Sequence, residues 1–147
     1  MKVIPAILAD HILAFNWDVR RVWEQKAEAS VLPLMDFDYL LNLPLWSSVP
    51  NQGMLFDISP REVIASPQRS PHQYRRILDA DIKFPIDLIS YRGRKWILDG
   101  VHRLAKLSLM GKTVVSIRLH DEAIISEIIA QAEQGGGGNA LKRVPHL

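Results

Sequence analysis

Cysteine is absent from this sequence of 147 residues, and its absence excludes disulfide bonds and thiolate metal sites. A chain without cysteine also fits a reducing compartment, and we expect a cytoplasmic protein. No apolar run approaches the roughly 20 residues that are needed to cross a bilayer. The opening segment, Met1 to Asp10, is too short and too soon interrupted to be a signal peptide. We therefore expect no membrane association.

Several motifs that would identify an enzyme are also missing. The sequence has neither a Walker nor a Rossmann glycine pattern, and no serine lies in a Gly-x-Ser-x-Gly setting. None of the five histidines is spaced from another histidine or a carboxylate as metal ligands are. They are His11, His72, His102, His120 and His146. We therefore predict no metal site formed by the chain itself.

The net charge is small, at +2, but it is unevenly distributed. Residues 1–68 carry a net charge of −3 and residues 119–147 carry −2, whereas residues 69–118 carry +7. Local positive charge would steer an anionic ligand toward this middle segment. It is too modest for the usual nucleic-acid footprint, so DNA is a partner that we do not favour. A solvated, arginine-rich surface explains the same asymmetry.

The basic segment contains the most informative stretch, residues 96–106. It predicts a strand, a tight turn at Asp99 and Gly100, and a helix with His102 and Arg103 in its first turn. The first turn of a helix offers unpaired N–H groups and the positive end of the dipole, so anions bind there. An imidazole and a guanidinium in the same turn strengthen such a site. We therefore predict a phosphate or carboxylate site at Gly100, His102 and Arg103.

A purely structural role explains the same residues. Asp99 is a good N-cap, Gly100 eases the turn, and His102 and Arg103 can be solvated side chains. Cations at a helix N-terminus are disfavoured by a few tenths to about 1 kcal/mol. A bound anion would reverse that penalty, which mildly favours the functional interpretation.

The box Asp99-Gly100-Val101-His102-Arg103 precedes a Leu/Ala-rich helix, Gly111 and a strand at 113–118. In this order, over residues 77–120, these elements resemble the ParB/sulfiredoxin superfamily. The box is most similar to the Asp-Gly-His-His-Arg form of ADP-dependent serine kinases, with Val101 in place of one histidine. The resemblance implies that Gly100, His102 and Arg103 hold nucleotide phosphates. The lack of cysteine excludes sulfiredoxin chemistry.

The resemblance also implies a ligand and a reaction. The expected ligand is ATP or ADP with Mg²⁺, and Asp99 would act as general base toward a substrate hydroxyl. The glutamate that the serine kinases use near their N-terminal end has no clear counterpart here. The first hypothesis is therefore a phosphotransferase acting on a small hydroxyl-bearing substrate. The alternatives are a non-catalytic module that senses a nucleotide or another phosphate-bearing small molecule, and a DNA-associated ParB-like protein of the partition or nuclease type.

Two further places offer candidate contacts. Arg75 or Arg76, which precede the hairpin, could reach a phosphate, although a solvated helix face explains them as well. The loop at 43–56 is rich in large apolar groups and folds over either the core or a ligand. Its Trp46 is a candidate for stacking on a base, and packing into the core is the competing explanation.

We predict an α+β fold, a small mixed sheet with surrounding helices, ParB/sulfiredoxin-like with an N-terminal extension. Strands are expected at 11–15, 29–34, 85–91, 95–98 and 113–119. Helices are expected at 17–27 with Asn16 as cap, from a capping box at Ser59 and Glu62, from Ser70, at 101–110, and from Asp121 through Ala132.

The predicted domain organisation is simple. Residues 1–134 are expected to form a single domain, within which residues 1–58 are a family-divergent N-terminal extension. Residues 135–147 are expected to be a Gly-rich break followed by a flexible tail, because four consecutive glycines at 135–138 give the backbone little stiffness.

Overall fold

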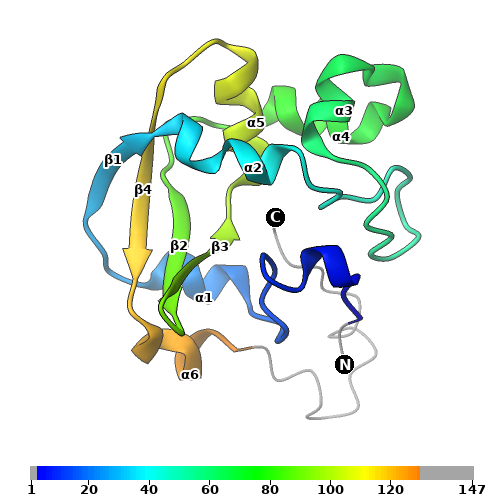
Figure 1. Ribbon diagram of the computed structural model, residues 1–147. Helices are drawn as coiled ribbons and strands as arrows, with labels where there is room; N and C mark the ends of the chain where they lie inside the picture. Colours follow the sequence, from blue (N-terminus) through cyan, green and yellow to red (C-terminus); the bar gives the residue numbers. More distant parts are fainter. Residues whose placement is uncertain (1–2, 130–147) are drawn as a thin grey trace.

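The computed structural model describes residues 3–129, in which four strands form one mixed sheet (Figure 1). The strands are β1 (Ala29–Pro33), β2 (Ile86–Tyr91), β3 (Arg94–Asp99) and β4 (Val114–His120). Their order is β1-β4-β2-β3; the β2–β4 pair is parallel and the other two pairs are antiparallel. The predicted α+β class and its mixed sheet are thus confirmed, together with the strands expected from residue 29 onward.

The helices surround this sheet. They are α1 (Val19–Glu24), α2 (Asp38–Leu41), α3 (Pro60–Ala65), α4 (Pro71–Asp79), α5 (Val101–Leu109) and α6 (Ile125–Ile128), with 3₁₀ turns η1 (Ala6–Leu8), η2 (Leu34–Phe37), η3 (Pro67–Arg69) and η4 (Glu122–Ile124). Helix α5 connects β3 to β4 and so makes the crossover that parallel pairing of β2 and β4 requires. Helices α3 and α4 lie together beside α5 (Figure 1).

The predicted capping box at the start of α3 is confirmed. The hydroxyl of Ser59 accepts a hydrogen bond from the backbone N–H of Glu62 at 3.1 Å, and the Glu62 carboxylate accepts one from the Ser59 N–H at 2.9 Å. These two bonds satisfy backbone donors that a helix start leaves unpaired. They also lower the pKa of Glu62, with the bond from the Ser59 N–H as the largest cause.

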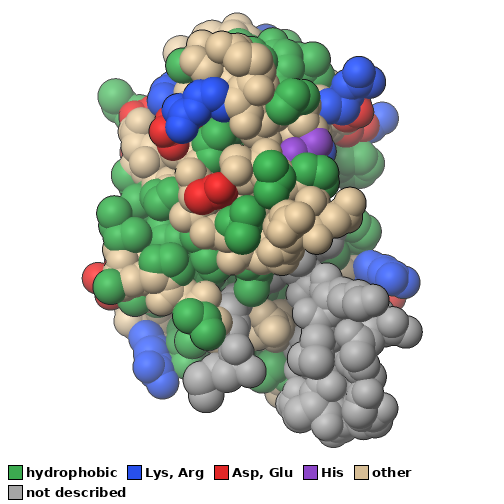
Figure 2. All heavy atoms as spheres, turned by 90° about the vertical axis from the view of Figure 1, so that its right-hand side faces the viewer, with side chains coloured by type: hydrophobic (Ala, Val, Ile, Leu, Met, Phe, Trp, Pro, Cys, Tyr) green, Lys and Arg blue, Asp and Glu red, His purple; other side chains and the backbone are tan. Residues whose placement is uncertain are grey.

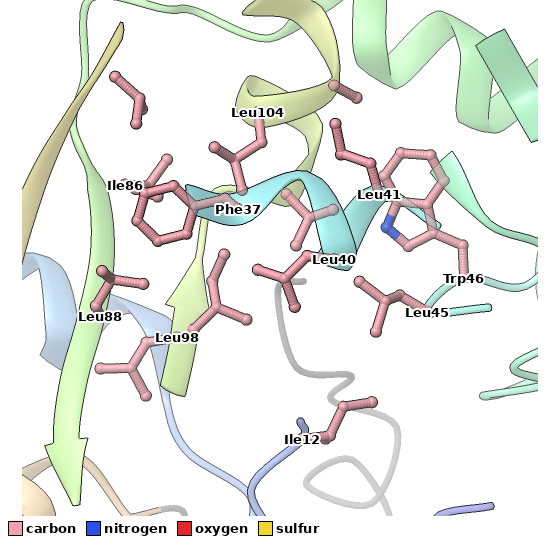
Figure 3. Close-up of a cluster of buried hydrophobic side chains, with 14 of the residues drawn as sticks. Ile12, Phe37, Leu40, Leu41, Leu45, Trp46, Ile86, Leu88, Leu98 and Leu104 are labelled. Carbon is pink, nitrogen blue, oxygen red and sulfur yellow. The ribbon is translucent and has the colours of Figure 1, made fainter. Parts of the chain in front are cut away.

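The hydrophobic core fills the space between the sheet, α5 and the segment η2–α2 (Figure 3). Strand β2 is central in the sheet, and its first four residues are buried. Edge strand β1 is mostly exposed. The side chains that meet between these elements include Phe37, Leu40, Leu41, Ile86, Leu88, Leu98 and Leu104. The core thereby holds the end of β3 and the start of α5 in place.

The N-terminal part of the chain departs from the prediction in two places. The strand expected at 11–15 is absent: this segment makes turns, and both Ile12 and Leu13 are buried in the core, so no alternation of faces develops. The helix expected at 17–27 is only α1, and its cap is Asp18, whose carboxylate accepts the Arg20 N–H at 3.0 Å, rather than Asn16.

The helix expected from Asp121 is also shorter than predicted. Asp121 caps the 3₁₀ turn η4, and α6 ends at Ile128 because Ile129 turns to an extended conformation and pairs with Trp17. The chain thus buries Ile128 and forms this bridge, and it does not continue as one amphipathic helix. Ala132 and the segment 135–147 lie outside the described residues. Over residues 3–129, no helix combines the length and apolar character that spanning a membrane requires.

Candidate functional site

The strand, turn and helix predicted for residues 95–110 are confirmed. Strand β3 ends at Asp99 and α5 begins at Val101, with Gly100 between them at φ +121°. A Cβ on Gly100 would lie 2.5 Å from the Ile86 Cγ2 atom and 2.8 Å from its Cβ. Glycine is therefore needed here both for its backbone conformation and for the close approach of β2. The start of α5 is pressed against the centre of the sheet.

Asp99 does not cap this helix, contrary to the structural role expected for it. Gly100 is the N-cap residue of α5, and its first turn has no side-chain capping bond. The Asp99 Oδ2 atom instead accepts hydrogen bonds from Trp23 Nε1 at 2.8 Å and from Arg103 Nη2 at 2.6 Å. These two bonds hold the Asp99 side chain away from the capping position. One partner is an arginine four residues along the chain, and the other is an indole from α1. The helix N-terminus is left open.

Arg103 is held within the protein. Besides its ion pair with Asp99, its Nη1 atom donates to the backbone carbonyl oxygens of Phe84, at 3.2 Å, and of Pro85. The side chains of Arg103 and Asp99 are only 15% and 9% exposed. Arg103 borders the predicted site, but Asp99 already balances its charge.

The imidazole of His102 is held on two sides. Its Nε2 atom lies 2.7 Å from the Gln73 side-chain oxygen, which can only accept, so Nε2 carries the proton. Its ring stacks on the indole of Trp46, with centroids 4.1 Å apart and planes 8° from parallel. Trp46 is itself only 4% exposed. It therefore packs in the core, as the competing explanation held, and it is too buried to stack on a base.

A cavity of about 260 Å³ opens at the N-terminus of α5. We call it the first-turn cavity; its lining includes Arg76, Asp79, Asp99, Gly100, His102 and Arg103. The structure thus brings all four residues predicted for the site, Asp99, Gly100, His102 and Arg103, to one cavity. Arg76, from α4, joins them there.

Arg76 differs from the other arginine of this cavity. It forms no ion pair or hydrogen bond with any residue between 3 and 129, whereas Arg103 is held at three places. Surrounding protein desolvates the Arg76 guanidinium and lowers its pKa, and the Asp99 carboxylate opposes this shift. Its side chain keeps access to solvent. Arg76 is consequently a cation available to a ligand.

A second cavity, of about 250 Å³, shares Arg76 and His102 with the first. It lies under the loop 43–56, and we call it the loop cavity. Its lining is mixed: Trp46, Met54 and Phe56 supply apolar surface, and His72 and Gln73 supply polar groups. Burial and the nearby charge of Arg76 lower the pKa of His72. Together the two cavities offer one charged compartment and one whose lining is part apolar and part polar.

Sequence reasoning missed part of this site. Gln73 and Arg76 lie three residues apart on α4 and therefore share one face of the helix, a spacing that could have separated Arg76 from Arg75. Trp23, from α1, is 54% exposed and bonded to Asp99. No local pattern connects residues that are 76 positions apart.

Within residues 3–129 no three His, Asp or Glu side chains come together as a metal-binding group. Comparison with protein-family models, with curated proteins and with solved structures found no match for this chain.

Proposed function

We propose that this protein binds the phosphate groups of a small molecule, and specifically of a nucleotide, at the N-terminus of α5. The proposal includes a ParB/sulfiredoxin-like form of the α+β fold, a cytoplasmic location, and ATP or ADP with Mg²⁺ as the ligand. Gly100 presents the backbone, His102 and Arg103 border the first turn, and Arg76 supplies the charge.

The observation that carries the proposal is the position of Arg76. Its guanidinium, without a partner among the described residues, lines the same cavity as the uncapped first turn of a nine-residue helix. Backbone N–H groups at a helix start and a guanidinium are both common donors to phosphate in proteins. A cation at a helix N-terminus is unfavourable unless an anion joins it. A phosphate would satisfy both groups together.

The remaining lining suits a nucleotide better than a bare phosphate. Asp79 and Asp99 add two carboxylates to the first-turn cavity, which repel a naked anion. A phosphate that arrives with Mg²⁺ carries less negative charge, and carboxylates favour that cation. The adjoining loop cavity offers apolar surface for the nucleoside next to Arg76 and His102.

The binding experiment is a calorimetric titration with phosphate, pyrophosphate, ADP and ATP, each with and without Mg²⁺. We expect ADP or ATP with Mg²⁺ to bind more tightly than pyrophosphate, and pyrophosphate more tightly than phosphate. Saturation at a hundred times the dissociation constant should stabilise the fold by about 2.7 kcal/mol in thermal unfolding. No heat and no stabilisation with any of these ligands would contradict the proposal.

Asp99 supports phosphoryl transfer as the reaction. Its Oδ2 atom is bonded to Trp23 and Arg103, which orients the carboxylate, while Oδ1 accepts no hydrogen bond from residues 3–129. A substrate hydroxyl oxygen would form a bond to the terminal phosphorus as the bond to the nucleotide breaks. The hydroxyl proton would pass to Asp99, and the remaining nucleotide would leave with the bonding electrons.

Asp99→Asn separates transfer from binding. The amide oxygen still accepts from Trp23 and Arg103, so the fold and most nucleotide affinity should remain, but it takes no proton. We expect turnover to fall by about 10² to 10⁴. The assay is nucleotide consumption with a panel of small alcohols, sugars and amino acids. Equal turnover by both proteins would exclude Asp99 as the base, and tight binding without turnover in the wild type would favour the sensing module.

A DNA-associated role receives less support. On the face seen in Figure 2, the described Lys and Arg side chains form small separate groups among hydrophobic and neutral atoms. Duplex binding uses a continuous basic surface and weakens steeply with salt. Salt-dependent affinity for duplex DNA would reverse this order of preference.

A further inference from the structure

A third cavity, of about 670 Å³, is larger than the two cavities described above. Its lining includes Trp23, Asp81, Phe84, Asp87, Arg103 and Arg118, and we call it the aromatic cavity. Small-molecule sites commonly have about 300–1,000 Å³. It touches the first-turn cavity only through Arg103, which lines both. The phosphate site described above does not use the rest of it.

Two aromatic side chains at this cavity are exposed. Trp23 and Phe84 are 54% and 58% exposed, although burying such rings is strongly favourable. Trp23 is also held in orientation, because its indole N–H is bonded to Asp99 at 2.8 Å. Flat, oriented and accessible aromatic surface next to a cavity is suited to stacking with a flat ligand.

Asp87 supplies a polar group inside the same cavity. Its side chain is only 3% exposed, and its Oδ1 atom accepts from Arg118 Nε at 2.7 Å and faces His120 Nε2 at 2.8 Å. Its other oxygen, Oδ2, accepts no hydrogen bond from residues 3–129. A ligand N–H that reaches this oxygen from the cavity would therefore add a charge-assisted hydrogen bond to the carboxylate.

The arginines of the cavity are already committed. Arg118 donates to Asp87 and to the carbonyl oxygens of Val22 and Gln25, at 3.2 and 2.8 Å, and Arg103 donates to Asp99 and two carbonyl oxygens. Because Arg118 balances the charge of Asp87, the ligand needs a donor and not a positive charge. The bonds to Val22 and Gln25 also hold the end of α1, which carries Trp23.

We propose that the aromatic cavity binds a small molecule with a flat aromatic ring and an N–H donor, as in an amino-substituted heterocycle. The ring stacks on Trp23 and Phe84, and the amino group donates to Asp87. This site is distinct from the phosphate site, since Arg76, Gly100 and His102 do not line it and the two cavities share only Arg103.

Two uncharged probes of the same shape test the proposal: 2-aminoquinoxaline and 2-methylquinoxaline, titrated into the full chain by calorimetry at neutral pH. We expect the amino compound to bind at least tenfold more tightly. Trp23→Ala and Phe84→Ala should each weaken it by about tenfold, the loss of one stacking partner. Tyr39→Ala, which removes an exposed aromatic side chain outside this cavity, is the matched control and should bind as the wild type does.

Asp87→Asn tests the donor contact. If the variant folds, the amino compound should lose its preference over the methyl compound, because one side-chain oxygen becomes an amide donor. Should it fail to fold, the two aromatic variants still decide. No binding of 2-aminoquinoxaline at millimolar concentration, no preference over the methyl compound, or wild-type affinity in both aromatic variants would overturn the proposal. Arg76→Gln should leave this binding unchanged, which separates it from the phosphate site.

Discussion

The aspartates of two aspartate–arginine pairs lie next to each other in the sheet. Asp87 on β2 and Asp99 on β3 are directly paired across the two strands. Carboxylates in such positions repel each other, yet each has its own arginine: Arg118 at 2.7 Å from Asp87 and Arg103 at 2.6 Å from Asp99. Both arginines are largely buried, at 16% and 15% exposure. Asp87 and Arg118 line the aromatic cavity, Asp99 lines the first-turn cavity, and Arg103 lines both.

The two pairs differ in how the chain encodes them. Asp99 and Arg103 are four residues apart, at the end of a strand and the start of a helix, whereas Asp87 and Arg118 are 31 apart and meet only because β2 and β4 are parallel neighbours. The first pair is local and the second is a product of topology. His120, which is also buried, depends on the second pair alone.

The largest expected effect concerns the pair made by topology. Asp87→Ala removes the partner of two buried groups, Arg118 and His120, and should lower the free energy of unfolding by about 3–5 kcal/mol. Asp99→Ala removes the partner of one largely buried group, Arg103, and of the half-exposed Trp23, so it should cost less, about 1.5–3 kcal/mol. Urea unfolding of both variants measures the difference. A smaller loss for Asp87→Ala than for Asp99→Ala would contradict the comparison.

The next effect tests how tightly the local pair is held against β2. Gly100→Ala places a methyl group against Ile86 and forces a non-glycine residue to φ +121°, so we expect a loss of about 2–4 kcal/mol. Gly93→Ala, at φ +73° with nothing within 4 Å, is the control and should cost only about 1–2 kcal/mol of backbone strain. Equal losses by thermal unfolding would show that the close approach to Ile86 is unimportant.

The smallest effect is a pH dependence. Burial and Arg76 lower the pKa of His72 below its ordinary value of 6.5. As the pH falls, His72 is therefore protonated in the unfolded chain at a higher pH than in the folded protein. It contributes stability above pH 6.5 that is lost as the pH falls through its folded pKa. A phosphate on Arg76 would offset the repulsion. NMR titration should therefore show the His72 pKa rising when pyrophosphate is added, and an unchanged value would place the anion elsewhere.

The comparison also explains how much the sequence could predict. Local chemistry was sufficient for the Asp-Gly turn, for α5 and for the capping box at Ser59, because each depends on neighbours within a few residues. Local chemistry was also sufficient to predict that Gly100, His102 and Arg103 lie together at the start of α5. It was misleading for Asp99, because a good N-cap residue was drawn to Arg103 and to a tryptophan from α1.

The remainder depends on which distant elements meet. Strand pairing decides that Asp87 lies beside Arg118, and packing of α4 on α5 brings Gln73 to His102 and Arg76 to the first turn. Neither contact has a sequence signal of its own. The strand expected at 11–15 was wrong for a related reason, since its apolar residues are buried in turns without a partner strand.

The central claim is that Arg76 and the first turn of α5 form an anion site, and one titration tests it most directly. Pyrophosphate is titrated into the wild type, Arg76→Gln and Arg75→Gln, where Arg75 is the adjacent exposed arginine outside the cavity. We predict that Arg76→Gln weakens binding about ten- to a hundredfold, as for the loss of a charged hydrogen bond, while Arg75→Gln binds as the wild type does. Equal affinities for all three proteins, or equal losses in both variants, would contradict the account.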